Sequence, residues 1–73
     1  MSEEVLNNEL RELFKKWRTD NYYPKVKEVA PVIGLNYEHF TKWLAGKIDY
    51  SKKSLFKIMS FLESKNYVLD VYY

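Results

Sequence analysis

The sequence of 73 residues contains no cysteine and only one histidine, His39. Without cysteine, neither a disulfide framework nor a zinc finger is available. A single histidine whose only acidic neighbour is Glu38 cannot complete a closed metal site or activate a nucleophile. We therefore expect no enzyme activity, no metal and no cofactor, and we interpret Trp17 and Trp43 as core residues.

Long apolar runs are also missing. The longest, Val29 to Leu35, is interrupted by Pro31 and Gly34 and is far too short to span a bilayer. The acidic start, Met1 to Glu4, lacks the basic region and apolar run of a secretory signal. These absences predict a soluble, cytoplasmic protein with no membrane partner.

The residues that are present suit one small domain over 1–73, because 47% are hydrophobic and 18% are aromatic. This length is near the lower limit at which a hydrophobic core can stabilise a fold without a disulfide or a structural metal. The formal net charge of +2 is unevenly distributed. Between Lys15 and Lys57 there are ten basic and four acidic residues, a net of +6, and the rest of the chain carries a net of −4. The basic segment favours a polyanionic partner, and a solvated lysine face is the alternative.

Helical spacing of apolar residues predicts four helices. The first begins after Ser2, a cap residue followed by two acidic residues, and the side chain of Ser51 is predicted to cap the fourth. The predicted ranges are 2–19, 25–33, 37–45 and 51 to about 65. The core positions predicted for the two outer helices are Leu6, Leu10, Leu13, Phe14, Trp17, Leu55, Ile58, Met59 and Leu62.

The last seven residues, Tyr67 to Tyr73, are rich in β-branched and aromatic side chains and predict a strand. A lone strand leaves its backbone groups unpaired. It should therefore pair with Lys47 to Tyr50, with the same tail of a second subunit, or with a partner protein. The alternative is a tail packed over the first helix without a partner. The residues predicted to form a dimer contact are Tyr67, Leu69, Val71 and Tyr73.

The stretch from Val26 to Ala45 has the spacing that two helices crossing through a tight turn require. Ala30 is small enough for the helices to approach each other. Gly34 supplies a positive φ that ends the first helix, and Asn36 caps the second. The inward-facing apolar positions are Val29, Ile33, Leu35, Phe40 and Trp43. The pattern predicts a helix-turn-helix.

This stretch resembles the helix-turn-helix of the phage repressor and Cro superfamily, the lambda-repressor-like proteins. The similarity extends over about residues 25–62, and its later positions are Gly46, Lys47, Ser51, Leu55, Lys57, Ile58 and Leu62. The resemblance implies an all-α domain of four short helices with a central helix-turn-helix and a strand-like tail. It also implies a transcriptional regulator, a repressor, that binds double-stranded DNA as a homodimer on an inverted repeat. A tail-to-tail ribbon is similar to the way Cro proteins dimerise.

The resemblance places the second motif helix in a major groove, with the residues near its N-terminus toward the bases. The predicted base-contacting residues are Asn36, Tyr37, Glu38, Thr41 and Lys42. Among these, Lys42 can donate to guanine and Glu38 can accept from the cytosine amino group. Lysines at helix starts can meet phosphates. The predicted phosphate-contacting residues are Lys25, Lys27, Lys47, Lys52 and Lys53.

Glu38 leaves a second function open, because a carboxylate is repelled by phosphates. The alternative is a protein-binding module, such as an antitoxin-like protein or a phage-encoded inhibitor, on the same scaffold. An architectural or recombination-accessory DNA-binding protein is a third interpretation. Binding that weakens steeply with salt favours the DNA functions, whereas salt-insensitive binding to a protein favours the module.

Overall fold

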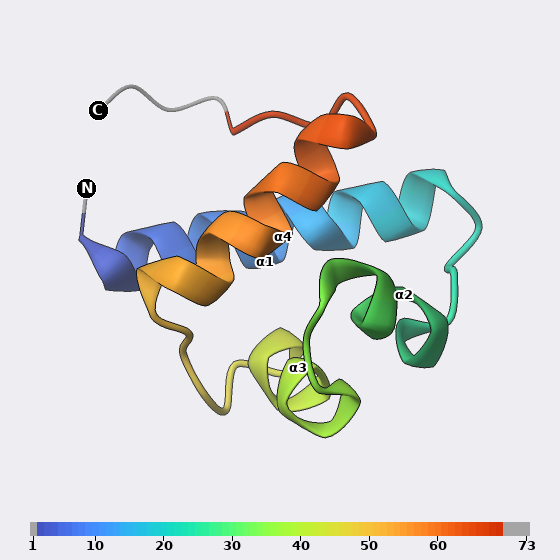
Figure 1. Ribbon diagram of the computed structural model, residues 1–73. Helices are drawn as coiled ribbons and strands as arrows, with labels where there is room; N and C mark the ends of the chain where they lie inside the picture. The colour runs from blue at the N-terminus through green and yellow to red at the C-terminus, as the bar shows by residue number, and fades with distance from the viewer. Residues whose placement is uncertain (1, 70–73) are drawn as a thin grey trace.

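The computed structural model describes residues 2–69 of the chain. Its helices are α1 (Glu3–Asp20), α2 (Val26–Ile33), α3 (Tyr37–Leu44) and α4 (Lys52–Ser64) (Figure 1). Residues 2–69 contain no strand. The predicted all-α class and the number and order of the helices are confirmed. None of these helices is long and apolar enough to cross a membrane.

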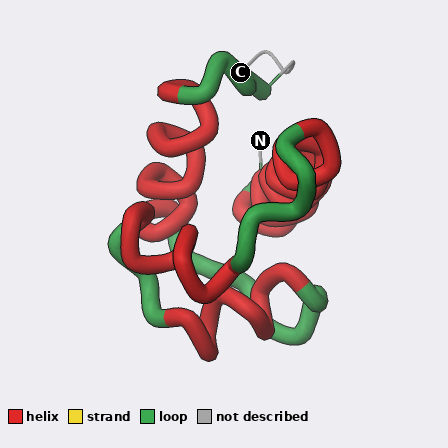
Figure 2. The backbone as a smooth tube through the Cα atoms, turned by 90° about the vertical axis from the view of Figure 1, so that its right-hand side faces the viewer, coloured by secondary structure: helices red, strands yellow, loops and turns green. Residues whose placement is uncertain are grey.

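The two long helices cross each other, and the two short ones lie together to one side. In Figure 1, α4 passes in front of α1, while α2 and α3 sit below them. Figure 2, turned by 90°, shows α1 nearly end-on beside α4. α4 packs against both α1 and α2, and α2 packs against α3. α4 therefore joins the first helix to the α2–α3 pair.

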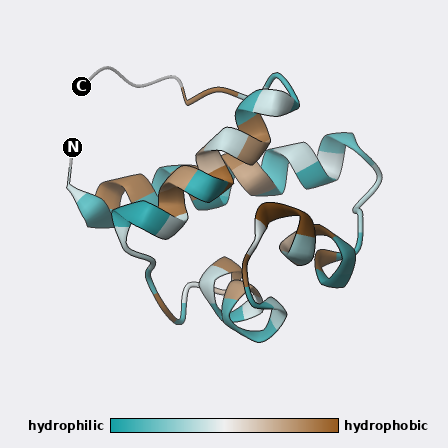
Figure 3. Ribbon diagram, viewed as in Figure 1, coloured by the Kyte–Doolittle hydropathy of each residue, from teal (hydrophilic) through white to brown (hydrophobic). Residues whose placement is uncertain are grey.

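All four helices contribute side chains to one core, and every helix carries both hydrophobic and hydrophilic segments (Figure 3). The Phe14 ring meets the Phe40 ring edge-on, with centroids 5.0 Å apart, and Phe40 stacks on Trp43 at 5.5 Å. The buried apolar residues are Leu6, Leu10, Phe14, Trp17, Val29, Ala30, Ile33, Phe40, Trp43, Leu55, Ile58 and Leu62. Most predicted core positions are confirmed, while Leu13, Leu35 and Met59 are only partly buried.

The start of α1 has the expected side-chain cap, whereas the start of α4 lacks one. The Ser2 hydroxyl oxygen accepts a hydrogen bond from the Val5 amide at 3.2 Å, as a cap residue does. Ser51 occupies the corresponding position before α4, but its side chain makes no capping bond. The predicted start of α4 is therefore right to within a residue, while the predicted role of the Ser51 side chain is wrong.

The predicted C-terminal strand is absent from the described part of the tail. Residues 67–69 lie over the core instead of pairing with Lys47–Tyr50, and Tyr67 and Leu69 are partly buried. The Tyr67 hydroxyl donates to Asp20 of α1 at 2.7 Å. Packing on its own chain thus partly covers two of the residues that were predicted to form a dimer contact, Tyr67 and Leu69. Two further residues of the predicted dimer contact lie outside the described residues: Val71 and Tyr73.

Candidate nucleic-acid interface

The connection between α2 and α3 consists of residues 34–36. Gly34 has a φ of 92°, and its amide donates to the Pro31 carbonyl at 3.1 Å. The Leu35 amide donates to the Ala30 carbonyl at 3.0 Å. These two bonds form the Schellman motif that ends a helix at a left-handed residue. The predicted role of Gly34 is confirmed, and three residues suffice to connect α2 to α3.

α3 begins at a side-chain cap and presents two unlike faces. The Asn36 side-chain oxygen accepts from the His39 amide at 3.1 Å, as predicted. Phe40 and Trp43 are 0% exposed and fix the inner face of α3 in the core. All five residues predicted to contact bases are exposed: Asn36, Tyr37, Glu38, Thr41 and Lys42. Since Tyr37 and Thr41, like Glu38 and Lys42, are one turn apart, the helix brings these side chains together on its surface.

Part of the hydrogen-bonding capacity on this surface is used within α3. The Asn36 oxygen holds the cap, and the Thr41 hydroxyl donates to the Tyr37 carbonyl at 2.9 Å. The remaining groups are the amide donors of Asn36, the hydroxyl of Tyr37, the carboxylate of Glu38 and the ammonium of Lys42. Donors and acceptors of this kind match the edges of base pairs in a major groove.

The lysines predicted to contact phosphates are exposed and come from three separate segments. Lys25 is the residue before α2, Lys47 follows α3, and Lys52 is the first residue of α4. The complete set is Lys25, Lys27, Lys47, Lys52 and Lys53. In residues 2–69 none of these ammonium groups forms a salt bridge with a carboxylate. The fold therefore leaves positive charge at the starts of α2 and α4 and at the end of α3.

Sequence reasoning missed a buried polar network that fixes the end of α3. Arg11 of α1 is only 7% exposed. Its guanidinium donates to the carbonyls of Trp43 and Ile48, and it forms a salt bridge of 2.6 Å with Asp49. It also lies 5.3 Å from the centroid of the Trp43 ring. A cation beside the last carbonyls of α3 stabilises that end of the helix dipole.

Asn7, one turn before Arg11, is 1% exposed and is fully used in hydrogen bonding. Its side-chain oxygen accepts from the Trp43 indole at 2.7 Å and from the Tyr50 amide at 2.9 Å. Its side-chain nitrogen donates to the carbonyls of Glu3 and Tyr50, at 2.8 and 3.1 Å. Backbone groups of Ile48 and Tyr50 are thus bound to α1, and this explains why this segment does not pair with the tail.

A signal for this network is present in the sequence. Asn7 and Arg11 lie on the apolar face of α1, at helical spacing from Phe14. Polar residues on such a face must be exposed or fully paired. The sequence could have indicated that they are paired, but their partners outside α1 are 32 to 43 positions away, so it could not have named them.

Two tyrosines near these elements have altered acidity. Burial raises the pKa of Tyr50, whose hydroxyl oxygen is buried without a hydrogen-bond partner in residues 2–69. The hydrogen bond to Asp20 raises the pKa of Tyr67, with smaller contributions from desolvation and from the Asp20 charge. Both tyrosines therefore stay protonated to higher pH than an ordinary tyrosine.

Within residues 2–69 no three His, Cys, Asp or Glu side chains lie close enough together to hold a metal ion. His39 is exposed on the first turn of α3. No protein-family model, curated protein or solved structure matches the chain. The assignment of a function therefore depends on the residues and the geometry of the chain itself.

Proposed function

We propose that this chain is a sequence-specific DNA-binding transcriptional regulator, a repressor of the phage repressor and Cro type. Residues 26–45 form the helix-turn-helix in this proposal. The observation that carries it is the division of α3 into two faces, with Phe40 and Trp43 buried and five polar or aromatic residues exposed. A helix held rigidly from behind, with donors and acceptors in front, suits insertion into a major groove.

In the proposed complex, Lys42 donates to guanine and Glu38 accepts from a cytosine amino group. Tyr37 packs against a thymine methyl group or donates to a phosphate. The exposed lysines at the helix ends bind phosphates on either side of the groove and supply the sequence-independent part of the affinity. Repression follows from occupancy of a promoter.

The proposal includes a homodimer on an inverted repeat, with half-sites one helical turn, about 34 Å, apart. Tyr67 and Leu69 contact their own chain, so a tail-mediated dimer would require these two residues to leave α1. Sedimentation of the full chain, with and without DNA, tests the dimer separately from DNA binding. A strict monomer at high micromolar concentration would remove the dimer and leave DNA binding to be judged alone.

Selection of binding sites from random duplex DNA, followed by a salt titration on the selected site, is the direct test. We expect an enriched sequence and an affinity that falls steeply with salt concentration. A variant with Lys25 and Lys52 both changed to Ala should show a shallower dependence on salt. No enrichment, together with no salt-dependent binding to any duplex, would overturn the proposal.

A protein-binding module is the second candidate, because Glu38 stands on the exposed face of α3 where phosphates would repel it. Glu38→Gln distinguishes the two functions. If Glu38 reads a base, the variant loses preference at one position of the selected site. If the surface binds a protein, removal of the carboxylate leaves DNA affinity unchanged and weakens the protein complex instead.

A further inference from the structure

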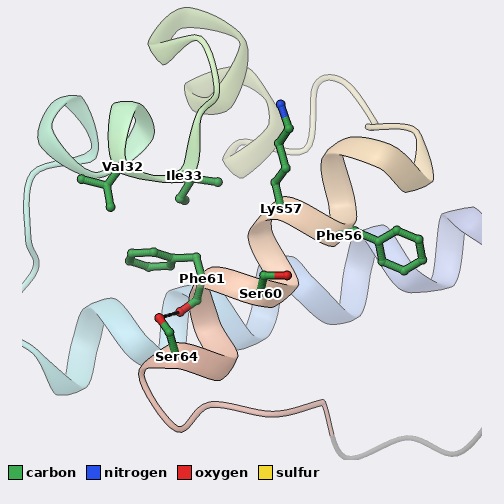
Figure 4. A pocket seen from close by; sticks show the side chains of 7 residues that line it. All are labelled: Val32, Ile33, Phe56, Lys57, Ser60, Phe61 and Ser64. Atoms are coloured by element: carbon green, nitrogen blue, oxygen red, sulfur yellow. Dashed lines mark hydrogen bonds between the residues drawn. The ribbon is translucent and has the colours of Figure 1, made fainter.

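A shallow hollow of about 510 Å³ lies between α2 and α4. Its apolar walls are Val32 and Ile33 of α2 and Phe56 and Phe61 of α4. Figure 4 shows Phe61 reaching toward Val32 and Ile33, with Phe56 at the opposite edge. None of its lining residues comes from α3. This α2–α4 hollow is therefore separate from the surface proposed to bind bases.

Two of the four apolar residues in the walls of the hollow are open to solvent, whereas Ile33 is buried and Phe61 is partly buried. Val32 is 73% exposed and Phe56 is 55% exposed. Single exposed apolar residues are common on protein surfaces, but a group of them beside a hollow is typical of a binding site. Val32 and Phe56 are large, and neither is needed to close the core around Ile58, which is already fully buried.

Among residues 2–69, the charged side chain that lines the hollow is that of Lys57. Two further lysines lie just outside the lining: Lys53 is one turn earlier on the same side of α4, and the Lys65 ammonium lies 5.7 Å from the centroid of the Phe61 ring. Between residues 52 and 62 of α4 there is no acidic residue. The nearest carboxylates along the two helices, Glu28 and Glu63, do not line the hollow.

Lys57 and Lys65, the residue directly after α4, are eight residues apart, so they mark two cationic positions about 12 Å apart in the direction of the helix axis. Between these two positions the lining residues of α4 are Phe61 and the small side chains of Ser60 and Ser64. A partner that complements this surface needs an apolar stripe with negative charges about two helical turns apart. An amphipathic helix has this arrangement, and docking of such a helix in a groove is a common mode of recognition.

We propose that the α2–α4 hollow binds an acidic amphipathic helix of another protein. Its leucine-like or phenylalanine-like anchors lie over Val32 and Phe61, and its carboxylates pair with Lys57 and Lys65. Because these lysines are not among the residues proposed to contact DNA, the hollow can be occupied while α3 lies in a groove. A regulator with both surfaces could bring an acidic partner to its DNA site.

A designed peptide tests this proposal. The probe is a labelled helical peptide with leucines at i, i+3, i+4 and i+7 and glutamates on both flanks. Binding to the full chain is measured by fluorescence anisotropy, and the site is mapped by amide chemical-shift changes. We expect the shifts to concentrate at residues 32–33 and 56–64. The double variant Lys57→Glu, Lys65→Glu should weaken binding about tenfold, because two ion pairs become repulsive.

A peptide with lysines in place of the glutamates should bind weakly to the wild type and recover affinity for the double variant. Lys15→Glu and Lys16→Glu on α1 serve as a matched control of equal charge change, with affinity expected to stay near that of the wild type. Equal loss in this control, equal binding of the lysine peptide to the wild type, or shifts elsewhere would overturn the proposal. Concentration-dependent shifts at the hollow without peptide would identify a second copy of this chain as the occupant and also overturn it.

Discussion

At the scale of single residues, Asn7 and Arg11 determine how the loop after α3 is held. Each occupies a buried position on α1 where an apolar residue would ordinarily pack. Together they bind the carbonyls of Trp43, Ile48 and Tyr50. Because Trp43 is the inner anchor of α3, the orientation of the proposed recognition helix depends on this pair.

Asn7→Leu should destabilise the fold by about 2 to 4 kcal/mol, since the buried Trp43 indole and Tyr50 amide lose their acceptor. Lys15→Leu, an exposed change on the same helix, should stay within about 0.5 kcal/mol. Urea unfolding followed by circular dichroism measures both. Equal stability of wild type and Asn7→Leu would show that water or a rearranged partner replaces the lost bonds.

Tyr50→Phe should change the free energy of unfolding in the opposite direction to Asn7→Leu and stabilise the fold by about 1 kcal/mol. The substitution removes a buried hydroxyl that has no partner in residues 2–69 and keeps the ring that stacks on Trp43 at 5.8 Å. Thermal melting at neutral pH is sufficient to detect this increase. A lower melting temperature would mean that the hydroxyl is hydrogen-bonded in solution.

Lys42→Ala and Lys52→Ala should affect DNA binding differently. Under the proposed function, loss of Lys42 costs about 1 to 3 kcal/mol on the selected site and relaxes preference at one base pair. Loss of Lys52 weakens specific and random duplexes alike and lowers the salt slope by roughly one unit. The measurement is anisotropy on both duplexes at several salt concentrations. If Lys42→Ala has no effect on either duplex, α3 does not lie at the interface.

At the scale of the elements, the turn between α2 and α3 requires glycine at position 34 for its backbone conformation and not for lack of room for a side chain. A Cβ built on Gly34 meets nothing within 4 Å, yet its φ of 92° strains any L-residue. Gly34→Ala should therefore cost about 1 to 2 kcal/mol, and Gly34→Asn less, because asparagine tolerates left-handed geometry better. Comparison of the two melting temperatures tests this. Equal losses would point to steric contact as the cause.

At the scale of the whole molecule, the raised pKa values of Tyr50 and Tyr67 link stability to alkaline pH. Folding favours the protonated form of both groups, so their contribution is complete below the ordinary tyrosine pKa of about 10. It is lost as pH rises through the folded-state values. We expect these two groups to leave the melting temperature unchanged from about pH 7 to 9. Above about pH 10 they should lower it.

Tyr67→Phe provides the control for the alkaline transition. It removes the bond to Asp20, and hence one source of the pH dependence, so the decrease above pH 10 should be shallower. The tail should also detach from α1 in this variant at neutral pH, which amide exchange of residues 67–69 would report. An alkaline decrease identical to that of the wild type would assign the transition to other groups.

The sequence by itself determined the features that depend on nearby residues. The spacing of Leu6, Leu10 and Trp17 predicted α1, because residues three or four apart share a helix face. Gly34 and Asn36 predicted the turn, because a positive φ and a cap are satisfied within a few residues. The exposed face of α3 followed from the same periodicity.

Only the tertiary structure decided the partners of Asn7 and Arg11 and the course of residues 67–69. The partners of these side chains on α3 and on the loop after it are 32 to 43 positions along the chain, beyond the range of any local pattern. The tail composition predicted a strand, yet Tyr67 and Leu69 pack on their own chain, and residues 48–50 bind side chains of α1. Strand propensity describes side chains that fit a half-buried surface, and here packing against α1 provided that surface without a second strand.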